Sequence, residues 1–151
     1  MTVVARAFVF CIALLPFGAL AQEVGTCDDF RTQASNLAEP WQDNTRLFAN
    51  GAIRIALMDT LEPAAGAFHL MILSLPADEL GLPQCRVVSA TGTMGFAFLT
   101  LDDLIPGYDP ANGLSLDLAG QAFQPDTGDF KDGRRMITVN QSTGKIAARF
   151  K

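Results

Sequence analysis

His69 is the first place to look for catalytic chemistry, because it is the only histidine in the 151-residue chain. Any histidine-dependent mechanism must use it, and a Ser-His-Asp arrangement would need a hydroxyl and a carboxylate beside it. The sequence contains no G-x-S-x-G motif to supply that hydroxyl. The apolar run around His69 favours a strand position where a neighbour satisfies the ring, and a catalytic or pH-sensitive role is the alternative.

Two acidic residues in predicted loops, Glu62 and Asp109, are further candidates for acid–base chemistry. A pair of carboxyl groups about 5–10 Å apart across a cleft can hydrolyse a glycosidic bond. Together with His69, these residues define the alternative hypothesis of a small periplasmic hydrolase. The simpler interpretation places both carboxylates in solvent as loop residues and leaves the chain without a catalytic residue.

Asp126, Asp129 and Asp132 recur at intervals of three residues, next to Gly128 and Gly133. Calcium binds several flexible oxygen ligands, but the familiar calcium loop places its ligands at every second residue. The three aspartates are therefore only weak metal candidates, and we expect no metal and no cofactor. Phosphate-binding glycine loops and dinucleotide fingerprints do not occur in the sequence.

Residues 1–21 have the layout of a Sec-type signal peptide. Arg6 provides the positive segment, an apolar run follows over 7–19, and Ala19-Leu20-Ala21 is a small-x-small cleavage site. We expect cleavage after Ala21 and a periplasmic or extracellular protein, the alternative being an uncleaved N-terminal anchor. After cleavage, the longest apolar stretch, 64–75, falls short of the roughly 20 residues that a transmembrane helix needs.

Removal of the signal peptide leaves two cysteines, Cys27 and Cys85. In an oxidising compartment two cysteines are expected to form one disulfide. A reactive thiol at Cys27, acidified by a helix N-terminus, is the functional alternative. The other alternative is that both cysteines are buried and unpaired.

Charge and length restrict the class of partner. The net charge is −5, which disfavours nucleic acid because that partner needs a basic surface. Residues 22–151 fit a single β-rich domain, since domains commonly contain about 100–150 residues. The partner stays unknown, with an envelope component or a small ligand as the expected classes.

Hydrophobic periodicity predicts one helix near the N-terminus and then strands. Thr26 and Asp29 form a helix-start signal, an apolar stripe follows, and Pro40 ends the run. Alternating apolar residues then predict about seven strands, at 53–57, 68–75, 86–90, 95–101, 114–119, 136–140 and 145–150. The longest loops are expected at 102–113 and 124–133.

These elements predict a mainly β fold, an antiparallel β-sandwich or small barrel of about seven strands with one N-terminal helix tied on by the disulfide. Segment 68–75 is apolar at successive positions, so we expect it to be a central strand covered on both faces. Without a catalytic motif, the leading hypothesis is a non-enzymatic binding or cell-envelope interaction module.

Overall fold

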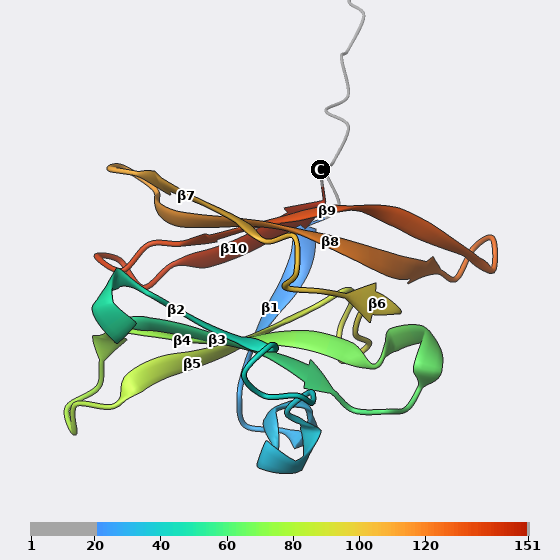
Figure 1. Ribbon diagram of the computed structural model, residues 1–151, viewed down its shortest axis with the longest axis horizontal. Helices are drawn as coiled ribbons and strands as arrows, with labels where there is room; N and C mark the ends of the chain where they lie inside the picture. Colours follow the sequence, from blue (N-terminus) through green and yellow to red (C-terminus); the bar gives the residue numbers. More distant parts are fainter. Residues whose placement is uncertain (1–20, 151) are drawn as a thin grey trace, which may run out of the picture.

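The computed structural model of the chain describes residues 21–150. It is mainly β, with two antiparallel five-strand sheets that lie as two layers, one above the other in Figure 1. The predicted signal peptide lies outside the described residues except for Ala21, and it stays a prediction. Among the described residues, no helix is long and apolar enough to cross a membrane.

The first sheet has the strand order β2-β3-β4-β5-β1. Its strands are β1 (Ala21–Thr26), β2 (Thr45–Phe48), β3 (Ile53–Asp59), β4 (Phe68–Ala77) and β5 (Pro83–Ser89). As predicted for segment 68–75, β4 is central. Its inner face is buried at Leu70 and Ile72, both 0% exposed. The outer face is covered only in part, because His69 is 1% exposed whereas Leu75 is 42% exposed.

The second sheet has the order β10-β9-β8, with β6 and β7 both paired to the far edge of β8. Its strands are β6 (Phe98–Leu99), β7 (Ile105–Asp109), β8 (Gly113–Gln124), β9 (Asp129–Val139) and β10 (Ile146–Phe150). The two segments predicted as long loops both contain strand residues. The 102–113 segment contains β7, and the 124–133 segment is the end of the β8–β9 hairpin, closed by a short turn at 125–128.

Strand β1 joins the two sheets, as its course between the layers in Figure 1 shows. Ala21 and Gln22 pair with β10, whereas the following four residues pair with β5. The opposite side is open, with β2 at one free edge and β6 and β7 at the other. The small-barrel alternative is therefore wrong for the described part of the chain.

The predicted N-terminal helix is also wrong. Thr26 lies at the end of β1, and the chain then makes two 3-10 turns, η1 (Phe30–Thr32) and η2 (Ala34–Asn36). Asp29 caps η1 by accepting a hydrogen bond from Arg31 N. Ala38 N donates to Leu57 O, which holds the segment against the edge of β3. A helix of three turns is only marginally stable by itself, so hydrogen bonds to the sheet determine the structure of this segment instead.

One apolar core lies between the two sheets. Inward side chains of β3 and β4 face those of β8 and β9, and the buried members of the cluster include Ile53, Ile55, Leu57, Leu70, Ile72, Leu116, Leu118, Ile137 and Val139. The predicted disulfide is confirmed, with the Cα atoms of Cys27 and Cys85 5.6 Å apart. It ties the segment that carries η1 and η2 to β5.

Candidate functional site

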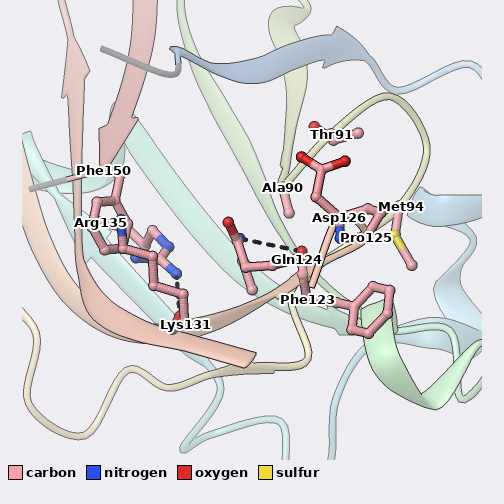
Figure 2. Close-up of a pocket in the computed structure, with 11 residues that line it drawn as sticks. Ala90, Thr91, Met94, Phe123, Gln124, Pro125, Asp126, Lys131, Arg135 and Phe150 are labelled. Carbon is pink, nitrogen blue, oxygen red and sulfur yellow. Dashed lines mark hydrogen bonds between the residues drawn. The ribbon is translucent and has the colours of Figure 1, made fainter. Parts of the chain in front are cut away.

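A cavity of about 290 Å³ opens at one end of the two layers. Figure 2 shows its walls, which come from three parts of the chain: the turn after β5, the end of the β8–β9 hairpin, and β10. The lining side chains are mostly apolar, with a few polar and charged groups, and comprise Ala90, Thr91, Met94, Ala122, Phe123, Gln124, Pro125, Asp126, Lys131, Arg135 and Phe150.

Arg135 occupies a position that the strand pattern assigns to the core. It lies on β9 two residues before Ile137, and its register partner on β8 is Leu118. Successive side chains of a strand point to opposite faces, so Arg135 lies on the same face as Ile137. The side chain is completely buried. A residue that is normally solvated thus lies at the wall of the cavity.

Two glycines that pair across the hairpin make room for this arrangement. Gly120 on β8 is the register partner of Gly133 on β9. A Cβ atom on Gly133 would lie 2.4 Å from Phe150 Cζ, and one on Gly120 would lie 2.9 Å from Leu99 Cδ1 and 3.4 Å from Arg135 Cγ. The absent side chain of Gly133 allows the Phe150 ring to lie against β9, and that of Gly120 leaves room for Leu99 and Arg135.

The Arg135 guanidinium is held mainly by aromatic rings. Its Cζ lies 4.4 Å from the Phe150 ring centroid and 5.4 Å from that of Phe96, within the range of cation–π attraction. Nη1 and Nη2 lie 3.5 Å from the carbonyl oxygens of Arg134 and Lys131. Nε has no hydrogen-bond partner among the described residues.

Burial lowers the pKa of Arg135 to about 10, and the negative charge of Asp132 acts against this shift. The guanidinium therefore stays protonated at neutral pH. No carboxylate forms an ion pair with it within residues 21–150. Nearby Lys131 is exposed and places Nζ 4.3 Å from the same Phe150 ring. Asp126 is the one carboxylate among the lining residues.

His69 belongs to a different buried cluster, on the outer face of the first sheet. Its Nδ1 lies 2.9 Å from Ser89 Oγ, which accepts a 2.8 Å hydrogen bond from Arg31 Nη1. Arg31 in turn forms an ion pair with Asp29 at 2.7 Å. The ring is buried and hydrogen-bonded through Nδ1, as the apolar strand predicts, but Nε2 has no partner among the described residues. Burial, and secondarily the positive charge of Arg31, lower the pKa of His69 to about 4.

The two carboxylates proposed for a hydrolase do not meet His69. Glu62 is exposed in the connection between β3 and β4. Asp109 ends β7, where its Oδ1 accepts hydrogen bonds from Ala111 N and from both nitrogens of Asn112. Asp109 lines a second, more open depression on the second sheet, which neither of the other two residues lines. The hydrolase hypothesis gains no support from this geometry.

The three metal candidates are not brought together either. Within the described part of the chain, no group of three His, Cys, Asp or Glu side chains could hold a metal ion. Asp126 lies at the cavity, Asp129 begins β9, and Asp132 accepts a hydrogen bond from Gln121. Cys27 is in the disulfide, so the reactive-thiol alternative is wrong.

Arg135 is not among the residues predicted for a site, although the sequence contains a signal for it. Extending the alternation of Ile137 and Val139 back by two residues places Arg135 on the core face. Phe150 and the glycine pair carry no such signal, because only the β8–β9 and β9–β10 registers bring them together.

Comparison of the chain with protein-family models, curated proteins and solved structures finds no match.

Proposed function

We propose that the protein is an exported, non-enzymatic binding module that takes up a small, largely apolar ligand in the cavity lined by Met94, Ala122 and Arg135. The disulfide indicates an oxidising compartment. Together with the predicted signal peptide, it supports a periplasmic or extracellular location. Of the two partner classes expected from the sequence, the cavity favours a small ligand over an envelope component.

The cavity is the observation that carries this proposal. Small-molecule sites are mostly apolar hollows of about 300–1,000 Å³ with a few polar groups that fix orientation. The volume here, about 290 Å³, lies just below that range. Ala90, Met94, Ala122 and Phe123 provide apolar walls, and Gln124 and Arg135 provide polar groups. A ligand with a short alkyl chain fits this combination.

Octan-1-ol is a suitable probe because it is apolar, small and uncharged. We expect its titration to give saturable changes in the NMR signals of the Met94 and Ala90 methyl groups. Ala122→Phe, which fills the cavity from β8, should abolish these changes. Ala147→Phe makes the same substitution at an exposed position on β10 and serves as the control. The proposal is wrong if wild type shows no saturation, or if both variants respond as wild type does.

The location has a separate test. Intact mass of the protein from its native source should correspond to a chain beginning at Gln22, with both thiols inaccessible to alkylation until reduction. A mass that retains Met1 would contradict export by signal cleavage.

A further inference from the structure

We infer that the ligand is a monoanionic amphiphile, a medium-chain alkyl carboxylate, whose headgroup pairs with Arg135 while its chain fills the apolar part of the cavity. This inference rests on the proposed function, because it assigns the ligand class of the same cavity. It is carried by the contacts of the guanidinium, by the charges around it and by the shape of the apolar wall.

The contacts of Arg135 leave hydrogen-bonding capacity unused. A guanidinium has five N–H donors, and typical N–H···O distances are about 2.7–3.2 Å. Both of its carbonyl contacts are longer, at 3.5 Å, and Nε has no partner among the described residues. A carboxylate can accept two parallel hydrogen bonds from one edge of a guanidinium. Such a headgroup would supply Nε and one Nη with the acceptors that they lack.

Burial makes this unused capacity energetically important. A buried charge is costly unless it is paired and hydrogen-bonded. Attraction to the Phe96 and Phe150 rings offsets only part of the cost of burying the Arg135 charge. A ring offers no hydrogen-bond acceptor in the plane of the guanidinium. An uncharged alkyl ligand would leave the cost of burying the Arg135 charge unchanged. The site therefore discriminates in favour of an anion.

The surrounding charges select a single negative charge. Two cations, Arg135 and Lys131, line the cavity, whereas Asp126 is its one carboxylate. Asp132 acts on Arg135 from outside the lining and raises its pKa. The lining thus has one net positive charge in a protein whose net charge is −5. A monoanion neutralises this lining, whereas a phosphate monoester, which approaches two negative charges at neutral pH, would exceed it.

The apolar wall receives the rest of the ligand. Figure 2 places Phe123 and Met94 on the opposite side of the cavity from Arg135 and Phe150, with Gln124 between them. A headgroup at Arg135 would therefore direct an alkyl chain toward Met94 and Phe123. The small volume favours a chain of medium length.

Four octyl compounds separate the alternatives: octanoate, octan-1-ol, octylamine and octyl phosphate. By calorimetry at neutral pH, we expect octanoate to bind about 10- to 100-fold more tightly than octan-1-ol, as a charged hydrogen bond implies. Octylamine should bind more weakly than octan-1-ol, and octyl phosphate more weakly than octanoate. Equal affinity of octanoate and octan-1-ol would overturn the inference and leave the proposed function intact. Failure of all four to bind would overturn both.

Variants assign the effect to Arg135. Arg135→Gln should reduce octanoate affinity to that of octan-1-ol, and the exposed Lys131→Gln should cause a smaller loss. Arg149→Gln removes the same charge from an exposed position next to Phe150 in sequence and should leave the affinity ratio unchanged. A ratio that survives in Arg135→Gln would overturn the assignment.

A measurement on the wild-type protein covers the case in which Arg135→Gln does not fold. The Arg135 Nε–H resonance should shift when octanoate is added, but not when octan-1-ol is added. An Nε–H signal unaffected by saturating octanoate would also overturn the inference.

Discussion

His69 and Arg135 are buried to nearly the same extent, 1% and 0% exposed, but they differ in how they meet the cost of burial. His69 can give up its charge, and its pKa of about 4 keeps the ring neutral at neutral pH. Arg135 keeps its charge, because its pKa of about 10 lies far above neutral pH. Each residue keeps one buried nitrogen without a hydrogen-bond partner among the described residues, His69 Nε2 and Arg135 Nε. Only Arg135 also keeps a charge, which an anionic ligand can neutralise.

The low pKa of His69 predicts acid sensitivity. The unfolded state takes up a proton near pH 6.5 and the folded state only near pH 4, so the unfolded state binds more protons between these values. Stability is then greatest above pH 6.5 and falls as the pH drops toward 4, by about 3 kcal/mol at most. Of the charged groups acting on the ring, Arg31 disfavours its protonation and Asp29 favours it.

Chemical denaturation at pH 7 and pH 4.5 checks this prediction. His69→Gln can keep a hydrogen bond to Ser89 but does not titrate, so it should lose distinctly less stability over the same interval. The pKa of Asp29 is itself lowered by its hydrogen bonds with Arg31, and its contribution is lost below this window. An equal loss in wild type and variant would show that His69 is not the sensitive group.

The β8–β9 hairpin builds most of the site. It brings Ala122, Lys131 and Arg135 to the cavity and pairs Gly120 with Gly133. Its outer end is supported by the Phe123 and Phe130 rings, whose centroids are 5.4 Å apart. Phe123 and Phe130 are register partners across the hairpin.

The glycine at position 133 should be required for Phe150 to occupy its place. In Gly133→Ala the added methyl group would clash with the Phe150 ring. We expect the substitution to lower the free energy of unfolding by about 1–3 kcal/mol. In a Phe150→Ala background the clash is removed, so the same substitution should cost much less. A double-mutant cycle measures the difference, expected to be about 1 kcal/mol or more. Additive effects would show that the two residues do not interact.

The sequence predicts elements better than it predicts their partners. Alternation identified the seven strands that carry most of the core, such as β3 with Ile53, Ile55 and Leu57. It missed β1, β2 and β7 because their patterns are short or polar, and hydrogen bonds to β5, β3 and β8 decide their structure. Among site residues, Arg135 could be placed on the core face, but its contact with Phe150 depends on register between distant strands.

One disulfide and one strand shared by both sheets connect the parts of the described chain. The disulfide spans 58 residues and connects the irregular N-terminal segment to β5. Closing a loop of this length restricts the unfolded chain and contributes about 4 kcal/mol to stability. The cavity lies elsewhere, since neither cysteine lines it.

Replacing both cysteines, as Cys27→Ser together with Cys85→Ser, should therefore lower the free energy of unfolding by about 4 kcal/mol. Denaturation with and without reductant provides the measurement, because reduced wild type should match the double variant. Octan-1-ol affinity, measured under folding conditions, should change little. A reductant effect that persists in the double variant would contradict the assignment to this bond.

The pairing of β1 with β10 also determines when, during synthesis, the two sheets can be joined. Ala21 and Gln22 pair with Arg149 and Ala148, so the earliest and the latest described strands complete one another. Because the chain is synthesised from its N-terminus, its two sheets cannot be joined through β1 and β10 until residues 146–150 have been made. Phe150, whose ring contacts both Lys131 and Arg135, belongs to β10. A chain truncated before Ile146 would lack the pairing of β10 with β1 and the Phe150 ring at the cavity, so ligand binding would report that synthesis had run through β10.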